Sequence, residues 1–255
     1  MYSIKTMAKD SRNLVNGLKF NAGRHLNYRV YTSMERALSF LLDGKVYVTD
    51  GKNWNDVNDR DILSNKKLYA KCFSCSTREN IAMWMLYGGE RGTKGACLNF
   101  PASVMKEIVN KSQIERGSFD KKTGKFVSRY TLEAKQDFEI FLIDVIYVDY
   151  CKNNKKKISY LEKSIVVEER ILDNDDVFYK NVAWQYEKEC RLIVRLSEYW
   201  EKKATNENIG IISITLSNKM INRMRKRGLV KSPVYEGDSE FGIPSTLVGT
   251  VEWKL

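Results

Sequence analysis

The chain reads WQYEKECRLIV at residues 184–194, and its last three residues form an apolar run typical of a buried strand. Side chains alternate along a strand, so Glu187, Glu189 and Arg191 are expected to share one face. Acids that share a face repel one another, and a chain keeps them where a cation or a reaction needs them. The other interpretation is an edge strand with a solvated, charged face. The stretch therefore predicts a strand that carries either a site or a solvated surface.

The composition predicts a cytoplasmic protein with a substantial core. Of the 255 residues, 43% are hydrophobic and 29% are charged. No run of about 18 apolar residues is present, so we expect no membrane span and no membrane partner. The first ten residues lack the apolar segment of a secretion signal. We expect an N-terminal arm at residues 1–24 and a single α+β domain of catalytic type at residues 25–255.

Cysteine and histidine usage argues against several kinds of site. The chain has five Cys, and an odd number in a cytoplasmic protein does not suit a disulfide framework. Cys72 and Cys75 have C-x-x-C spacing, but no second pair follows, so buried thiols are expected and no metal is. His25 is the only His, which leaves Cys–His or Ser–His nucleophilic catalysis with little support.

The charge balance suits a polyanionic partner. Lys and Arg number 43 against 32 Asp and Glu, and the net charge is +11. One basic cluster is expected in a loop and the other on a helix that starts near Ser217. The candidate contacts to nucleic acid or another polyanion are Lys155, Lys156, Lys157, Arg223, Arg225, Lys226 and Arg227. A solvated basic surface is the alternative interpretation.

The order of apolar patterns predicts an α+β fold with a mixed, mainly antiparallel sheet and flanking helices. Expected strands cover residues 28–31, 46–49, 67–76, 95–100, 138–150, 190–196, 209–216 and 247–253. One expected helix follows Ser33 as its N-cap, and others cover residues 80–87, 103–109, 159–170 and 217–227. Residues 111–135 are expected to form a hairpin, and residues 52–61 a polar loop.

Residues suited to binding an anion or a ring occur at three places. Arg29 lies on a short expected strand and offers a forked donor for phosphate or carboxylate. Ser74, Ser76 and Thr77 lie where a strand leads to a helix start, a position that favours an anion. Trp84 and Tyr87 are three residues apart and share one helical face, where core packing is the alternative.

These stretches form an ordered set of short elements along most of the chain. The elements are Tyr28-Arg29-x-Tyr31-x-Ser33, Trp54-Asn55-Asp56, Cys72-x-Ser74, Met83-Trp84-x-x-Tyr87, Gly95-x-x-Leu98, Trp184-x-Tyr186-Glu187-x-Glu189-x-Arg191 and Lys231-Ser232-Pro233-Val234-Tyr235. The set resembles a large bacterial family of uncharacterised domains. One element departs from the family pattern, Trp-x-Asp-Pro, because Val57 follows Asp56 here.

The layout of that family is similar to that of ADP-ribosyltransferases, which use NAD. The resemblance implies a split, mostly antiparallel sheet and a transferase, with a bacterial toxin or phage-defence effector as the expected role. The basic surface would suit RNA or DNA as the acceptor, and an antitoxin is a candidate partner. The resemblance also implies that Arg29 holds the pyrophosphate or a ribose. Glu189 is expected as the essential carboxylate and Glu187 as the acceptor-side one, with the reverse assignment as the alternative. The NAD contacts that it implies are Arg29, Ser74, Ser76, Thr77, Trp84 and Tyr87.

Two other functions fit the same residues. One is a non-catalytic module that binds nucleic acid or a defence partner and uses its Glu and Arg residues as a structural ion network. The other is a metal nuclease, which would need Asp56, Glu187 and Glu189 to gather. The transferase hypothesis requires Glu187 or Glu189 to face Arg29 and Ser74 across a cleft, because catalytic groups converge on one reacting centre.

Overall fold

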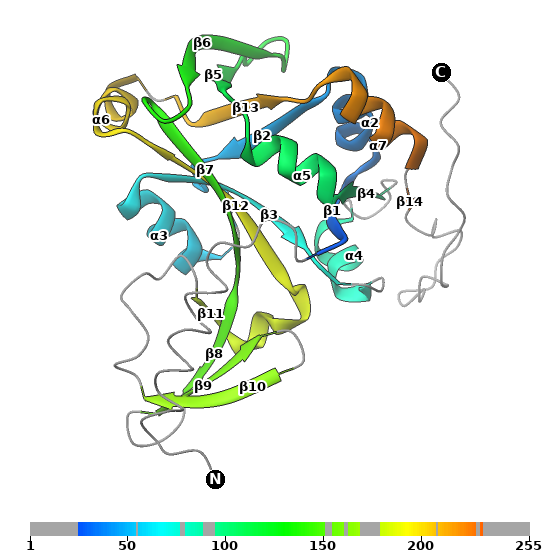
Figure 1. The fold of residues 1–255 in the computed structure, drawn as a ribbon, viewed down its shortest axis with the longest axis vertical. Coiled ribbons are helices and arrows are strands. Elements are labelled where there is room, and N and C mark those ends of the chain that lie inside the picture. Colours follow the sequence, from blue (N-terminus) through cyan, green and yellow to red (C-terminus); the bar gives the residue numbers. More distant parts are fainter. Residues whose placement is uncertain are drawn as a thin grey trace.

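The computed structural model describes residues 25–54, 56–76, 80–88, 95–150, 155–160, 163–168, 179–207, 209–227 and 230–231 (Figure 1). The expected arm at residues 1–24, the expected strand at residues 247–253 and Thr77 lie outside these ranges. So do residues 232–235 of the last family element.

The larger of the two sheets in the described ranges is antiparallel at every pairing. Its strands are β1 (Asn27–Ser33), β2 (Lys45–Thr49), β3 (Leu68–Ser74), β4 (Gly95–Pro101), β5 (Gln113–Phe119), β6 (Phe126–Glu133), β7 (Phe138–Asp144), β12 (Glu189–Leu196), β13 (Ile211–Thr215) and β14 (Val230–Lys231). The path runs β14-β4-β1-β3-β2-β13-β5-β6, and β12 branches from β3 with β7 on its other side. The expected mixed fold with a mainly antiparallel sheet is confirmed.

The smaller sheet lies at the lower end of the molecule in Figure 1. Its strands are β8 (Ile146–Tyr150), β9 (Lys155–Tyr160), β10 (Lys163–Glu168) and β11 (Tyr179–Asn181), in the order β10-β9-β8-β11. Only β11 and β8 pair in parallel within it. The chain crosses from the large sheet to the small one at Val145, whose N–H donates to the Glu189 carbonyl at 3.0 Å. The single strand expected over residues 138–150 is therefore two strands in two sheets.

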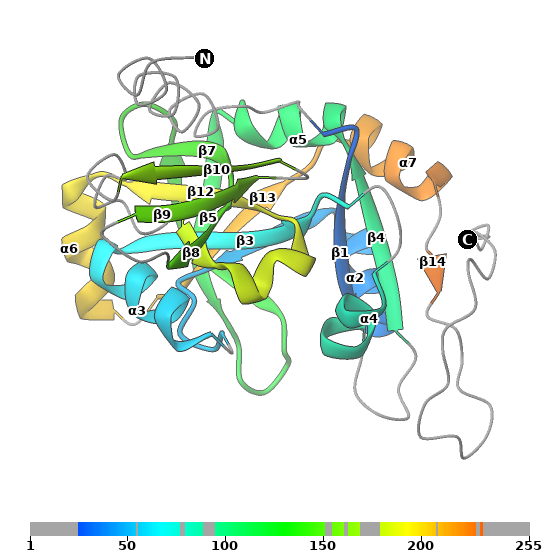
Figure 2. The same cartoon turned by 90° about the horizontal axis from the view of Figure 1, so that it is seen from below.

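Helices cover both faces of the large sheet. They are α2 (Met34–Asp43), α3 (Val57–Lys66), α4 (Ile81–Tyr87), α5 (Ala102–Val109), α6 (Glu198–Glu207) and α7 (Asn218–Arg227), with a 3-10 helix η3 (Val182–Glu187). The main core joins α2, α5 and α7 to one face, whereas smaller apolar clusters join α3 and α4 to the other. In Figure 2, α3, η3 and α4 lie along one side of β3 and α5 lies on the opposite side. Among the described residues, no helix is long and apolar enough to cross a membrane.

Strand β12 is the buried centre of this arrangement. Leu192, Ile193 and Val194 are fully buried, each contributing roughly 1.5–3 kcal/mol of apolar burial. Glu189 lies opposite Ser74 of β3, and it is also buried. The interpretation as a solvated edge strand is therefore wrong, since β12 pairs with β3 on one side and β7 on the other.

Short polar side chains start the helices that flank β3. Ser33 caps α2, as expected, by accepting a hydrogen bond from the Arg36 N–H. Asp56 caps α3 by accepting from the Asn58 and Asp59 N–H groups. Asn80 caps α4 in the same way. Each cap contributes about 1 kcal/mol and fixes where the helix begins.

Two expected elements are wrong. The helix expected at residues 159–170 is replaced by β9 and β10, which pair from Lys155↔Glu168 to Tyr160↔Lys163. The β-branched run at residues 165–167 favours a strand. Lys155, Lys156 and Lys157 accordingly lie on β9 and not in a loop.

The loop expected at residues 52–61 ends early, because Asp56 caps a helix that runs from Val57. Glu187, Glu189 and Arg191 were expected to alternate along one strand, but only Glu189 and Arg191 lie on β12. Glu187 ends η3, and Lys188 has a φ of 44°, so the strand begins only at Glu189.

Candidate active site

A cleft with a volume of 420 Å³ opens beside β3 and is lined by residues of β1, β3, α3, α4, β11, η3 and β12. Sites for small molecules have volumes of about 300–1,000 Å³, so this cleft suits a ligand. Five of the residues predicted to act in catalysis or NAD binding line it, namely Arg29, Ser74, Tyr87, Glu187 and Glu189. The geometric requirement of the transferase hypothesis is met, although the roles of these residues stay a prediction.

The pairing of three strands brings the predicted residues together. Ser74, the last residue of β3, lies opposite Arg29 of β1 and opposite Glu189 of β12. The strands diverge beyond this point, because β1 continues along β4 and β12 along β7. The cleft thus forms where the large sheet splits.

Three carboxylates converge on one ammonium group in the cleft. Lys180 of β11 places its Nζ 2.7 Å from Glu187 Oε2, 3.1 Å from Glu189 Oε2 and 3.3 Å from Asp59 Oδ2. The Lys180 side chain is 8% exposed, so these contacts are little screened by solvent. Its Nζ also lies 4.8 Å from the centre of the Trp184 ring.

Arg191 joins two of these carboxylates from beneath. Its Nε donates to Glu189 Oε1 at 2.6 Å, and its Nη2 donates to both oxygens of Asp59 at 2.7 and 2.8 Å. The side chain is fully buried. A buried guanidinium needs such partners, because an uncompensated charge in the interior costs several kcal/mol.

The network treats its two glutamates differently. Burial alone would raise the pKa of Glu189, but the charges of Arg191 and Lys180 outweigh burial and hold this pKa below its usual range. Burial raises the pKa of Glu187, and the charge of Glu189 raises it further, against a partial offset from Lys180. Glu189 is thus the fully compensated carboxylate, and Glu187 carries the charge that the network neutralises least.

Tyr87 of α4 gives Glu187 a neutral partner. Its hydroxyl donates to Glu187 Oε1 at 2.9 Å. Burial and the Glu187 charge raise the pKa of Tyr87, so the phenol keeps its proton at neutral pH. The hydrogen bond orients the carboxylate without adding a positive charge.

Positive side chains and an uncommitted hydroxyl also line the cleft. Arg29, Arg36 and Lys71 supply the charges. Burial lowers the pKa of Lys71, and the charge of Arg36 contributes. Ser74 is 1% exposed, and its Oγ has no hydrogen-bond partner within the described ranges. An unsatisfied buried hydroxyl that lines a cleft is a feature that a polar ligand would explain.

Two predicted contacts do not line this cleft. Trp84 is buried and packs edge-on against Tyr31 with ring centres 4.9 Å apart. Ser76 is buried beyond the end of β3. Core packing, the alternative given for Trp84, describes it better, so neither residue is retained as a ligand contact.

The described residues that line the cleft include none of the predicted basic clusters. The second basic cluster was expected on a helix that starts near Ser217, and α7 confirms this prediction. On that helix Arg223 donates to Ser103 Oγ and Arg225 to the Leu41 carbonyl, which leaves Lys226 exposed. Arg227 ends the helix and Lys157 is exposed on β9. Contact with a polyanion stays a prediction for these residues.

Sequence reasoning missed Asp59 and Lys180, which complete the cluster. Asp59 lies on a helix that was expected to be a loop, and Lys180 lies on a three-residue strand. The Asp56 cap, which sets the helical phase of Asp59, was the one available signal.

The fold and the cleft define a class: an open, mainly antiparallel α/β protein with a buried acid–base cluster where its sheet splits. Residues 83–192 match the model of a family described as "Protein of unknown function (DUF2971)". The match includes Tyr87, Glu187, Glu189 and Arg191, and it confirms the resemblance to a family of uncharacterised domains. No curated protein and no solved structure matches the chain.

Proposed function

We propose that this protein is an ADP-ribosyltransferase-like enzyme that cleaves the bond between nicotinamide and ribose in NAD and transfers ADP-ribose to an acceptor. The observation that carries the proposal is the charge balance of the buried cluster at one side of the cleft. Asp59, Glu187 and Glu189 supply three negative charges when ionised, whereas Lys180 and Arg191 supply two positive ones. The cluster therefore has one negative charge in excess.

An excess negative charge suits a reaction that develops positive charge. Breaking the nicotinamide–ribose bond leaves both electrons on the departing ring and positive character on the anomeric carbon. A carboxylate fixed beside that carbon stabilises the transition state more than the ground state. Burial strengthens the effect because little water is present to screen it.

The geometry favours Glu187 as the reacting carboxylate. Both oxygens of Glu189 are held by Arg191 or Lys180. Glu187 instead shares Lys180 and has the neutral Tyr87 as its other partner. We therefore exchange the roles expected from the sequence: Glu187 faces the reaction, and Glu189 positions Lys180 and Arg191 around it.

The remaining lining suits the other parts of NAD. Arg29, Arg36 and Lys71 would hold the pyrophosphate, for which a guanidinium fork is well shaped. The Ser74 hydroxyl would donate to a ribose or phosphate oxygen. Trp54 and Trp184 are half-buried in the same lining and offer aromatic faces for ring stacking.

Transfer also requires that the acceptor lose a proton. A hydroxyl or amine that attacks the anomeric carbon forms one bond to it and releases one proton. Glu187 is suited to accept that proton because burial and the Glu189 charge raise its pKa and so make it a stronger base. The fold is compatible with the split sheet of ADP-ribosyltransferases, and the likeness of fold is part of the proposal.

The decisive experiment measures NAD consumption. Full-length protein is incubated with radiolabelled NAD and a mixture of cellular protein, RNA and DNA, and free nicotinamide and labelled polymer are quantified. We expect both products with the wild type. Glu187→Gln should reduce the rate by about 10²–10³-fold, the usual effect of removing one transition-state contact.

The matched control is Glu198→Gln, whose side chain is 78% exposed on α6 and pairs with Lys202. It should leave the rate unchanged. Intact NAD after incubation with folded wild type in all acceptor mixtures would refute the transferase proposal.

The alternative is a non-catalytic module, and the buried network of Arg191, Glu189 and Asp59 is the observation in its favour. Such a network can exist for stability alone. In that case the protein would bind RNA or DNA equally well with Glu187→Gln and would release no nicotinamide.

A further inference from the structure

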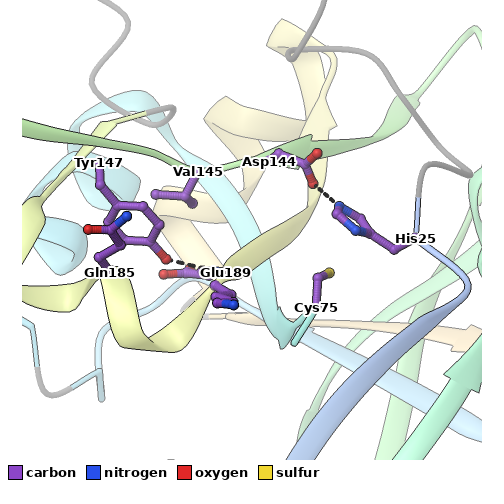
Figure 3. A pocket seen from close by; sticks show the side chains of 8 residues that line it. His25, Cys75, Asp144, Val145, Tyr147, Gln185 and Glu189 are labelled. Atoms are coloured by element: carbon purple, nitrogen blue, oxygen red, sulfur yellow. Dashed lines mark hydrogen bonds and ion pairs between the residues drawn. The ribbon is translucent and has the colours of Figure 1, made fainter. Parts of the chain in front are cut away.

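A second cluster of reactive side chains lies on the other face of the β3–β12 pair (Figure 3). His25 Nε2 lies 2.8 Å from Asp144 Oδ1, and the two side chains are 11% and 5% exposed. Cys75 directly follows β3 and is 8% exposed, and its N–H donates to the Lys188 carbonyl at 2.8 Å. Figure 3 shows the Cys75 sulfur turned toward the His25 ring. A thiol, an imidazole and a carboxylate thus converge from three distant segments.

The cluster favours a thiolate at Cys75. Burial would lower the pKa of His25, but its hydrogen bonds with Asp144 and Cys75 raise this pKa to about 10. Burial would raise the pKa of Cys75, but hydrogen bonds with Cys190 and His25 and the imidazolium charge lower it. Both shifts favour the imidazolium–thiolate form of the pair over the neutral form, and the thiolate is the reactive form of cysteine.

The cavity beside this pair limits what can reach the sulfur. Its volume is 10 Å³, about the space that one water molecule needs. Besides the cluster it is lined by Val145, Tyr147, Gln185, Lys188 and Glu189. A peptide, an acyl substrate or glutathione does not fit inside such a space, whereas the two oxygen atoms of hydrogen peroxide can reach the sulfur because the cavity is partly open to solvent. The reactive thiolate is therefore suited to oxidation and not to acyl transfer.

A second thiol lies next to the first. Cys190 of β12 is 1% exposed and shares a hydrogen bond with Cys75. Burial raises the pKa of Cys190, whereas the pKa of Cys75 is lowered, so Cys75 is the more readily ionised of the two thiols. This pairing of a readily ionised thiol with a less readily ionised one matches the division between an attacking and a resolving cysteine.

We propose that Cys75 is a site of reversible oxidation by hydrogen peroxide or a similarly small hydroperoxide, with His25 and Asp144 as positioning residues and Cys190 as the resolving thiol. The Cys75 thiolate attacks one peroxide oxygen, the O–O bond breaks, and hydroxide leaves with its electron pair. Sulfur is oxidised to the sulfenic acid and peroxide is reduced. The Cys190 sulfur then attacks Cys75, a disulfide forms, and the thiol proton leaves with the hydroxyl as water. The site is independent of NAD.

The test is thiol mapping of the full-length reduced protein after treatment with stoichiometric hydrogen peroxide at pH 7. Trypsin leaves Cys72 and Cys75 on residues 72–78 and Cys190 on residues 189–191, so fragment spectra must locate the link. We expect a Cys75–Cys190 disulfide that a reductant reverses. In Cys190→Ala we expect sulfenic acid trapped at Cys75 by dimedone.

Cys72 is the internal control and needs no variant. It lies on β3, three residues before Cys75, and is more exposed than Cys75, yet burial and the Glu189 charge raise its pKa. Exposure alone predicts that Cys72 reacts first, whereas the proposal predicts that Cys75 reacts at least tenfold faster. Faster oxidation of Cys72, a Cys72–Cys75 link or lasting sulfenic acid in the wild type would overturn the proposal.

Asp144→Asn distinguishes positioning from structure. The variant should slow Cys75 oxidation at pH 7 and restore it toward pH 9, where an ordinary thiol ionises by itself. A rate loss that is equal at both pH values, in a protein whose circular dichroism is unchanged, would contradict the role given to Asp144 and His25.

Discussion

The two faces of the β3–β12 pair share one backbone and differ in how they hold charge. On the cleft face, Glu189 and Arg191 belong to a network of groups that stay ionised across the neutral range. On the opposite face, the charges of Cys75 and His25 depend on each other, because each side chain shifts the pKa of the other. Alternation along a strand is enough to separate these environments, as adjacent Ser74 and Cys75 illustrate. One pair of strands can therefore hold a fixed electrostatic site and a titratable one back to back.

The largest effect should come from removing the cation beneath the cleft. Arg191→Met leaves Glu189 and Asp59 with one fewer positive partner in a buried site. We expect a loss of about 3–5 kcal/mol in the free energy of unfolding, measured by urea denaturation. Arg195→Met is the control on the same strand, because Arg195 is exposed and should cost less than about 0.5 kcal/mol. Similar losses for both would mean that the network contributes nothing beyond surface charge.

Substitutions of the two glutamates should differ in their effect on the free energy of unfolding and on its pH dependence. At pH 7, Glu189→Gln should cost about 1–3 kcal/mol, because Arg191 and Lys180 lose a charged acceptor, whereas Glu187→Gln should cost less than about 1 kcal/mol. The lowered pKa of Glu189 gives stability that is full above pH 4.5 and is lost as the pH falls. The raised pKa of Glu187 has the opposite sign, so stability declines as the pH rises above 4.5.

Urea denaturation of both variants at pH 4, 6 and 8 checks these signs. Glu187→Gln should remove the decrease in the free energy of unfolding as the pH rises. Glu189→Gln should remove the increase in the free energy of unfolding as the pH rises from 4. Parallel pH profiles for the two variants would show that the network does not distinguish its carboxylates.

The smallest effect concerns the opposite face and is a shift in one titration. His25 is the chain's only His, so its NMR signal needs no further assignment. We expect no titration between pH 5.5 and 8, since the pKa is raised to about 10. The contribution of protonated His25 to the free energy of unfolding is then complete below pH 6.5, and it is lost as the pH rises through about 10. Asp144→Asn should lower this pKa by at least about one unit, equivalent to 1.4 kcal/mol. A midpoint near 6.5 in the wild type would remove the imidazolium from the thiol cluster.

The sequence was a good guide where a local pattern carried the structure. The apolar run at residues 192–194 predicted β12, and the position of Ser33 before an apolar helical face predicted α2. The order of Arg29, Ser74 and Glu189 along the chain predicted three strands that do pair at one point. Strong periodicity and helix caps depend on residues that are close in sequence, so they predict the local structure without knowledge of the fold.

The rest depended on contacts between distant residues. Lys180 has no pattern around it that marks a buried cation, because its three carboxylate partners come from α3, η3 and β12. His25 and Asp144 are 119 residues apart, so the thiol cluster could not be anticipated from spacing. The sequence argument against Cys–His chemistry assumed that a partner would be visible along the chain, and in the fold Asp144 is that partner.

The position of β12 in the sheet also bears on the order in which the protein folds. Strand β12 pairs with β3 and β7, both of which are synthesised well before it. Until β12 is present, those two strands have unpaired edges, which are prone to wrong association. Pairing between distant segments is also slow, because the chain loop must close before the contacts form. Both the cleft and the thiol pocket contain residues of β12, so neither can be complete until this late strand inserts.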